Sequence, residues 1–406
     1  MTIMMDQLIK AISAALDIVE GELLGASTHH GKRVAVLCAA MGRGLGMDEV
    51  SVSSLVTCAL LHDNALTEYI LSEREGGFHD PAMKTHCEIG QRNADTLGFP
   101  TDISGFVLYH HECASGTGAF GKKEGEYPVE AALIQIADSL DVTRHLQRVS
   151  LQELPAIRAQ IEEMGGIFYT RGASQALLKT LDEKTLLSLR DEHIAATIEL
   201  AIPHWPVDME DHSIQNLAGF VTRIIDYKSE FTKRHSAQIA NKAYLLSEYY
   251  GYNKTLRAQV YLAAALHDIG KLAIPSAILE KPGRLDDDEF TIIKSHAYKT
   301  WELLKDIAGF EDICAWASNH HEKLDGTGYP FGKKASELDF ISRLIACIDI
   351  YQAVSEDRPY HGRRSHRDSI NILLEMAGAG VVDKSIVQDL DKVLSDFSCQ
   401  DVPPPP

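Results

Sequence analysis

A set of histidine and aspartate residues occurs twice along the chain in the same order, and this repetition restricts the folds open to it. Corresponding members lie 205 to 211 residues apart, and ten of the eighteen histidines belong to the set. Neighbouring text repeats as well, as in Ala59–Asp63 and Ala264–Asp268. Such self-similarity predicts a tandem duplication, with two similar domains in a row. The members are His30, His62, Asp63, His86, His110, His111 and Asp138 in the first half, and His235, His267, Asp268, His296, His320, His321 and Asp349 in the second.

The duplication predicts the domain boundaries. The first copy is expected over residues 1–195 and the second over 213–398, because Pro203 and Pro206 interrupt helix continuity between them. Residues 399–406 form a proline-rich tail that we expect to be extended. Apolar residues recur at helical spacing after His235, after Leu256 and between 286 and 304, whereas alternating segments are short and few. The predicted fold class is therefore all-α, in two similar helical bundles.

Composition excludes several classes of function. The chain of 406 residues carries 39 Lys and Arg against 58 Asp and Glu, a net charge of −19, which argues against DNA or RNA as a partner. No segment reaches the roughly 18 consecutive apolar residues that span a bilayer, and the first twenty residues lack a signal-peptide core. The seven cysteines are odd in number and sit largely in apolar runs. We expect a cytoplasmic protein with reduced thiols and no membrane partner.

The residue types of the repeated set favour transition metals. Imidazole and carboxylate together suit Fe, Mn, Zn, Co or Ni, whereas Ca and Mg prefer oxygen alone. Seven such groups exceed what one tetrahedral zinc with an open position needs, and they suit two ions with a carboxylate such as Asp268 between them. Two ions about 3.5–4 Å apart can hold a hydroxide and clamp both oxygens of an in-line displacement at phosphorus. The set therefore predicts hydrolysis of a phosphate ester.

Two further features accompany the set in the second half. Lys271 follows the His267-Asp268 pair by about one turn, where an ammonium can reach a non-bridging phosphate oxygen. The segment Asp325 to Pro330 contains two glycines that let the backbone approach a ligand, and Tyr329 can stack on a base or hydrogen-bond to it. A solvated surface lysine and a plain tight turn are the alternative interpretations.

These residues resemble the HD-GYP subgroup of the HD-domain metal-dependent phosphohydrolases. The resemblance lies in His267-Asp268-Ile269-Gly270-Lys271 and in segment 320–330, and it covers most of residues 213–398. It implies two tandem HD-type helical bundles, the first of them divergent. It also implies phosphodiesterase activity on a bacterial 3′,5′-cyclic dinucleotide, cyclic di-GMP and/or 3′3′-cyclic GMP-AMP, through a hydroxide held by two metal ions. The product would be a linear 5′-phosphorylated dinucleotide.

By position, the resemblance assigns roles to residues of the second half. It implies two divalent transition-metal ions, iron or manganese first, with nickel, cobalt or zinc as alternatives. Asp268 and Lys271 would be catalytic. The metal ligands would be His235, His267, Asp268, His296, His320, His321 and Asp349, and the substrate contacts would be Lys271, Asp325, Gly328, Tyr329 and Arg358.

Departures from the family pattern also carry predictions. Family members with three metal ions have a Glu four residues before the first ligand and an Asp three residues after the last. This chain has Phe231 at the first of these positions and Gln352 at the second, so we expect two ions in the second half. The first half keeps all seven ligand types but has Leu66 in place of the lysine and Ala119-Phe120 in place of Tyr-Pro. Because buried histidines and aspartates are costly without a metal, we expect the first half to bind metal without independent catalysis. A decayed copy retained for packing is the alternative.

Two other functions stay open at this level. The chain could be a cyclic-dinucleotide receptor with little turnover, or an HD-type phosphohydrolase acting on another nucleotide. Through the family resemblance, the intact Lys271 and the Gly328-Tyr329-Pro330 segment favour the enzyme that cleaves a cyclic dinucleotide. The two halves could pair as an internal pseudo-dimer, and a homodimer is left open.

Overall fold

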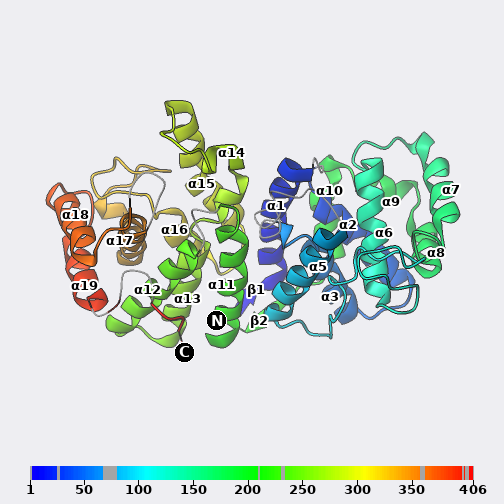
Figure 1. The fold of residues 1–406 in the computed structure, drawn as a ribbon, viewed down its shortest axis with the longest axis horizontal. Coiled ribbons are helices and arrows are strands. Elements are labelled where there is room, and N and C mark those ends of the chain that lie inside the picture. The colour runs from blue at the N-terminus through cyan, green and yellow to red at the C-terminus, as the bar shows by residue number, and fades with distance from the viewer. Residues whose placement is uncertain are drawn as a thin grey trace. The chain divides into compact units, whose positions relative to one another are not determined.

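The computed structural model describes residues 2–24, 28–66, 80–208, 211–229, 234–356, 362–395, 397 and 402–405. The chain divides into two compact units (Figure 1). The N-terminal unit comprises Met4–Val207, and the C-terminal unit comprises Asp208–Pro406 together with Met1–Ile3. The short strands β1 (Thr2–Met4) and β2 (Pro206–Asp208) form a two-stranded sheet where the division falls.

Helices dominate both units, which confirms the predicted all-α class. The N-terminal unit contains α1 (Met5–Leu24), α2 (His30–Gly44), α3 (Glu49–Leu60), α5 (Asp80–Ala94), η1 (Asp95–Leu97), α6 (Val129–Arg144), η2 (Leu151–Glu153), α7 (Leu154–Met164), α8 (Arg171–Thr180), α9 (Glu183–Ser188) and α10 (Asp191–Ala201). The C-terminal unit contains α11 (Asp211–Asp226), α12 (His235–Tyr249), α13 (Lys254–Leu266), η4 (Ile269–Ala273), α14 (Ser276–Leu279), α15 (Asp287–Leu304), α16 (Glu311–Ser318), η5 (Ala335–Glu337), α17 (Phe340–Ser355), α18 (His366–Gly378) and α19 (Lys384–Leu394).

A buried helix precedes the His-Asp pair in each unit. In the N-terminal unit, nine consecutive residues of α3, Val52–Leu60, are buried, and α3 packs against α1 and α2. In the C-terminal unit, residues Val260–Leu266 of α13 are buried, and α13 packs against α11, α12 and α16. A helix that is buried on all sides lies inside a bundle. These two helices end immediately before the two His-Asp pairs of the repeated set.

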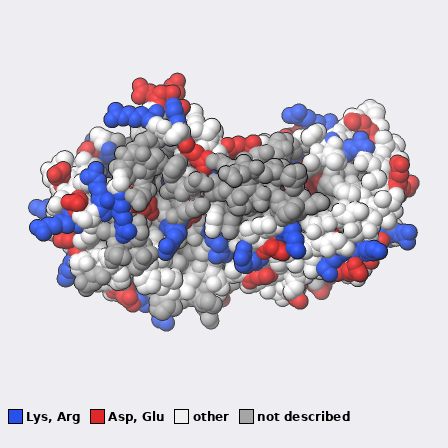
Figure 2. Space-filling model, viewed as in Figure 1, with Lys and Arg blue, Asp and Glu red and all other residues white. Residues whose placement is uncertain are grey.

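Two further observations concern the charge on the surface and the length of the helices. Acidic and basic side chains are interspersed over the described part of the face shown in Figure 2. In the described part of the chain, no helix has the length and apolar character needed to cross a membrane.

Candidate metal centre

Helix caps and backbone conformation position the histidines alike in both units. The Asn253 side chain accepts a hydrogen bond from Leu256 N at the start of α13 (2.9 Å), and Asp48 caps α3 in the same way. The residue before the first histidine of each set has a left-handed backbone, with φ of 74° at Arg234 and 63° at His29. That conformation is unfavourable for residues other than glycine, and such strain clusters at functional sites.

The C-terminal unit brings all seven predicted ligands of the second half together. The donor atoms of His235, His267 and Asp268 lie within 4.8 Å of one another, and so do those of His296, His320 and His321. Asp349 completes the set, with Oδ1 3.3 Å from His235 Nε2 and Oδ2 3.5 Å from His321 Nδ1. We call these seven residues the C-terminal cluster.

Asp268 lies between the two groups of histidines. Its Oδ2 is 3.1 Å from His267 Nε2 and 3.9 Å from His235 Nε2. Its Oδ1 faces the other group, 3.3 Å from His296 Nε2 and 3.8 Å from His320 Nε2. A carboxylate whose two oxygens face two separate sets of imidazoles has the placement expected of a ligand shared by two ions.

Hydrogen bonds fix which ring nitrogen of each histidine faces the centre. The Nδ1 atoms of His267, His296 and His320 lie 2.6–2.7 Å from the backbone carbonyls of residues 264, 293 and 317. Carbonyl oxygens only accept, so each Nδ1 carries a proton and Nε2 is the ring nitrogen that faces the centre. Metal-ligating histidines typically make this second hydrogen bond.

Two of these nitrogens stand unusually close. His296 Nε2 lies 3.0 Å from His320 Nε2, although both rings donate their Nδ1 proton elsewhere. Two lone pairs facing one another repel unless a cation lies between them. Neighbouring nitrogens bound to one ion at about 2.1 Å would have a comparable separation. The donor set therefore fits a metal ion.

Most protonation states in the cluster suit metal binding, and His235 is the exception. Burial would lower the pKa of His235, but the Glu356 and Asp349 carboxylates raise it to about 9, so metal binding has to displace a proton there. Burial lowers the pKa of His296 to about 3 and that of His321 to about 4, so both imidazoles are neutral near pH 7. Burial alone would raise the pKa of the Asp268 carboxyl, but His267 and the Lys271 ammonium outweigh it and hold that pKa well below its ordinary value. Neutral imidazole and ionised carboxylate are the forms that bind metals.

The predicted substrate contacts lie at different places around this cluster. Lys271 Nζ contacts Asp268 Oδ2 at 2.5 Å, and the Tyr329 ring centroid lies 4.8 Å from that of His321. Asp325 is exposed and accepts hydrogen bonds from the backbone and hydroxyl of Thr327, within its own turn. Arg358 lies outside the described residues, as does Phe231. Contact of these residues with a substrate stays a prediction.

Packing explains the glycine at position 328. A Cβ at Gly328 would collide with the backbone of Glu322 and Lys323, and a Cβ at Gly118 would collide with Glu112 in the same way. The Glu322 carboxylate accepts hydrogen bonds from the backbone N–H groups of residues 331, 332 and 333, which holds the loop against the segment that carries His320 and His321. This glycine is thus required by the loop itself.

The N-terminal unit assembles its own seven residues in the same arrangement. Donor atoms of Asp63, His86, His110 and His111 lie within 4.8 Å of one another, and so do those of His30, His62 and Asp138. Asp63 Oδ1 is 3.0 Å from His86 Nε2 and its Oδ2 is 3.4 Å from His62 Nε2. We call this set the N-terminal cluster. The Nε2 atoms of His30, His62 and His110 have no hydrogen-bond partner among the described residues, as expected of atoms reserved for a metal.

The surroundings of the two clusters differ. Leu66, which occupies the position of Lys271, is buried with 4% of its surface exposed, so no ammonium stands beside Asp63 at this position. A cavity of about 220 Å³ adjoins the N-terminal cluster at His111 and Asp138, and Cys113 and Phe168 are among its other walls. The first half keeps the donors but has a leucine at the position of Lys271.

Three carboxylates that are not among the predicted ligands contact the clusters, and of these the sequence pointed only to the position of Asp141, which matches Gln352 of the second half. Glu356 Oε2 accepts a hydrogen bond from His235 Nδ1 (2.8 Å), and Asp141 Oδ2 accepts one from His30 Nδ1 (2.7 Å). Glu20, 3% exposed, places Oε1 3.4 Å from His30 Nε2. The spacing of Glu356 from Asp349, two helical turns, was the one available signal for it. Glu20 comes from α1, and nothing in the repeated set points to it.

Both units match known families. Residues 28–143 match one model of the HD domain, and residues 219–386 match a second model of the HD domain. A crystal structure of the cyclic GMP-AMP-specific phosphodiesterase V-cGAP3 of Vibrio cholerae has the same fold, with a TM-score of 0.67, 22% identity and coverage of 97% of this chain and 98% of that one.

Relatives of known activity align with one or both units. The 3′3′-cGAMP-specific phosphodiesterase 1 of Vibrio cholerae is 27% identical over 390 residues, which cover 92% of this chain and 88% of that protein. The 3′3′-cGAMP-specific phosphodiesterase 3 of the same organism is 29% identical over 73% of this chain and 64% of its own length, slightly under two thirds. A cyclic di-GMP phosphodiesterase of Pseudomonas aeruginosa is 31% identical over half of each chain.

Proposed function

This chain is a tandem HD-domain protein, homologous to the 3′3′-cGAMP phosphodiesterases and to HD-GYP proteins, and on that premise we propose that its C-terminal domain hydrolyses a 3′,5′-cyclic dinucleotide. The reaction would open one phosphodiester and release a linear 5′-phosphorylated dinucleotide. The observation that carries the proposal is the contact of Lys271 Nζ with Asp268 Oδ2 at 2.5 Å, which puts a cation beside the carboxylate between the two histidine groups. The N-terminal domain lacks this cation.

The seven residues of the C-terminal cluster would hold two divalent transition-metal ions. When bound, such ions polarise a phosphoryl oxygen and lower the pKa of water. The side chain of Lys271 is 18% exposed, so its ammonium can leave Asp268 and donate hydrogen bonds to a phosphate oxygen. Negative charge that develops on the phosphate would then meet a positioned cation in a partly dehydrated site.

Tyr329 would help to position the substrate. Its ring lies against His321 at the edge of the cluster, and burial raises the pKa of its hydroxyl, which therefore stays protonated and can donate a hydrogen bond. An aromatic ring with a polar tip suits a nucleobase, because the face can stack while the hydroxyl bonds an edge. We assign Tyr329 to base contact rather than to chemistry.

The relatives favour one substrate over the other. The curated relatives that align with most of this chain act on 3′3′-cGAMP, whereas the cyclic di-GMP phosphodiesterase of Pseudomonas aeruginosa aligns with half of it. We therefore propose 3′3′-cGAMP as the preferred substrate and cyclic di-GMP as the weaker one. For the N-terminal domain we propose metal binding without hydrolysis.

Product chromatography tests the activity. Full-length protein, reconstituted anaerobically with Fe(II) or Mn(II), would receive 3′3′-cGAMP and cyclic di-GMP in parallel. We expect a linear dinucleotide, faster from 3′3′-cGAMP. Lys271→Gln should lower kcat by about 100-fold or more, because it removes a charge that acts in the transition state. Lys299→Gln is the matched control, since Lys299 pairs with Glu302 on the surface.

The same experiment can refute the proposal. Wild-type protein with bound metal that converts neither substrate would contradict hydrolysis, and cyclic-dinucleotide binding without turnover would identify a receptor. Equal turnover by Lys271→Gln and Lys299→Gln would remove Lys271 from the site.

A further inference from the structure

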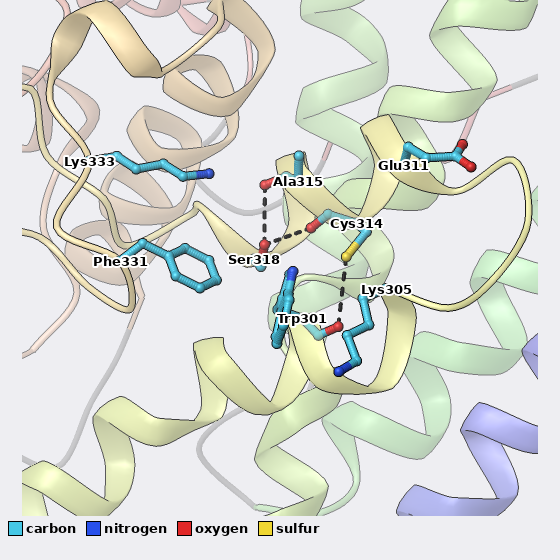
Figure 3. A pocket seen from close by; sticks show the side chains of 8 residues that line it. All are labelled: Trp301, Lys305, Glu311, Cys314, Ala315, Ser318, Phe331 and Lys333. Atoms are coloured by element: carbon cyan, nitrogen blue, oxygen red, sulfur yellow. Dashed lines mark hydrogen bonds between the residues drawn. The ribbon is translucent and has the colours of Figure 1, made fainter.

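The C-terminal unit contains a pocket that lies outside the C-terminal cluster. Its volume is about 370 Å³, and it is bounded by the end of α15, one side of α16 and the loop after Pro330 (Figure 3). The residues that define its character are Trp301, Lys305, Cys314, Phe331 and Lys333. None of them belongs to the predicted metal ligands or substrate contacts. A cavity of this size is sufficient for a ligand as large as a mononucleotide.

Two aromatic rings form a corner of the pocket. The ring centroids of Trp301 and Phe331 are 5.8 Å apart, and the ring planes meet at 80°. Phe331 is 41% exposed, an uncommon state for a phenylalanine. A flat ligand stacked on one of these rings presents its edge to the other, and both arrangements are favourable for aromatic pairs. The corner therefore suits a planar ring.

Cations stand beside both rings. Lys333 Nζ lies 5.1 Å from the Phe331 centroid and 3.0 Å from Asn319 Oδ1, and Lys305 Nζ lies 4.6 Å from the Trp301 centroid. Glu311 borders the pocket too, but Figure 3 shows its carboxylate directed away from the rings. The charge near the aromatic corner is thus positive.

The Ser318 hydroxyl and the Cys314 thiol, which also line the pocket, contribute little to the binding of a charged ligand. The Ser318 hydroxyl donates to the carbonyl of Cys314 at 2.7 Å, so its proton is already engaged (Figure 3). Cys314 is buried, and burial raises the pKa of its thiol to about 11, so it carries no charge near pH 7. Specificity must come from the rings and the lysines.

We propose that this pocket binds a nucleoside monophosphate, with the base in the Trp301–Phe331 corner and the phosphate at Lys333. Stacking accepts any base, since every base has a π face, whereas the ammonium requires the phosphate. The site is separate from the proposed catalytic centre, and the inference does not rest on hydrolysis. Lys333 Nζ bonds Asn319, the residue before His320, so an occupant would contact the segment that carries two of the predicted ligands.

Calorimetric titration of the metal-free, full-length protein tests the proposal. The probes are GMP, AMP, guanosine and inorganic phosphate. We expect GMP and AMP to bind with Kd values within about fivefold of one another, because stacking discriminates weakly between bases. Guanosine and phosphate alone should each bind at least about tenfold more weakly, since each lacks one of the two contributions.

Two variants locate the binding site. Lys333→Gln should weaken GMP binding about tenfold, as expected for loss of one charged hydrogen bond, and Lys334→Gln, an exposed neighbour outside the pocket, should not change it. Phe331→Leu alters a partly exposed ring and should weaken GMP binding while leaving phosphate binding unchanged. Absence of saturable GMP binding up to millimolar concentration overturns the proposal. Equal affinities in Lys333→Gln and Lys334→Gln do the same, because GMP would then bind elsewhere.

Discussion

The first histidine of each cluster is held by a different partner in the two domains. In the C-terminal domain, His235 donates to Glu356, and Gln352 Nε2 donates to the other oxygen of that carboxylate at 2.5 Å. In the N-terminal domain, Asp141 occupies the position of Gln352 and accepts directly from His30. The second oxygen of Asp141 accepts from Arg33 Nε at 2.7 Å. The first imidazole is thus oriented by a glutamate in the C-terminal domain and by an aspartate–arginine pair in the N-terminal domain.

This difference predicts unequal effects for two matched substitutions. Glu356→Gln should weaken metal binding by the C-terminal domain about 10- to 100-fold, because the orienting hydrogen bond loses its charge, with little change in unfolding free energy. Asp141→Asn should instead lower the unfolding free energy by about 3 kcal/mol, because the fully buried Arg33 loses its buried carboxylate. Metal analysis after dialysis against graded chelator, together with urea unfolding, measures both quantities. Similar stability losses in the two variants would contradict the assignment.

At the scale of elements, the docking of α15 on η4 positions His296. Gly270 lies where a Cβ would collide with the backbone carbonyl of His296. Thr300 connects the same two elements, since its hydroxyl donates to His267 O at 2.8 Å and accepts from Gly270 N at 3.1 Å. The close approach of these backbones brings the His267-Asp268 pair and His296 into one site, which a larger residue at 270 would prevent.

Gly270→Ala is therefore expected to disrupt both folding and metal binding. The added methyl has to move α15 away from η4, and overpacking of this kind costs about 1–3 kcal/mol. His296 would move with its helix, so iron or manganese binding by the C-terminal domain should weaken as well. Gly283→Ala is the control, because a Cβ there meets no atom within 4 Å. Thermal melting and metal content of the two variants should differ clearly, and equal values would contradict this account of the docking.

At the scale of the molecule, the duplication gives two sites with unequal chemistry. Both domains keep seven donors, but Lys271 is present in one and replaced by Leu66 in the other. Burial of so many imidazoles and carboxylates is costly without compensating cations. The similar geometry of the N-terminal cluster supports the proposal that it binds metal, and the proposed hydrolysis belongs to the C-terminal domain.

Metal stoichiometry tests this division. We expect about four ions per chain, two in each domain, on the basis of a carboxylate shared by two ions. Asp63→Ala and Asp268→Ala should each reduce the content by about two ions. Added metal should still raise the melting temperature of either variant, because the other domain remains able to bind. A content of two ions that only Asp268→Ala abolishes would show that the N-terminal cluster is empty.

Much of the candidate site followed from the sequence because metal ligands must be particular residue types. The repeated order of five histidines and two aspartates predicted two all-α domains and the members of both clusters, and the helical class is confirmed. Capped helices such as α13, whose N-cap is Asn253, follow from local chemistry and need no distant contact. The same holds for Lys271, because one helical turn separates it from Asp268.

Only the tertiary structure decided what surrounds the donors. Glu20 and Glu356 reach the clusters from parts of the chain that the repeated set does not include. In the sequence they cannot be distinguished from acidic residues that lie on the surface. Asp141 is an orienting partner because Arg33 and His30 pack on either side of it. The sequence determined which groups could bind metal, since that depends on residue chemistry. The packing of the helices determined which nitrogen faces inward and which carboxylate lies between, since those depend on atoms that meet only in the folded chain.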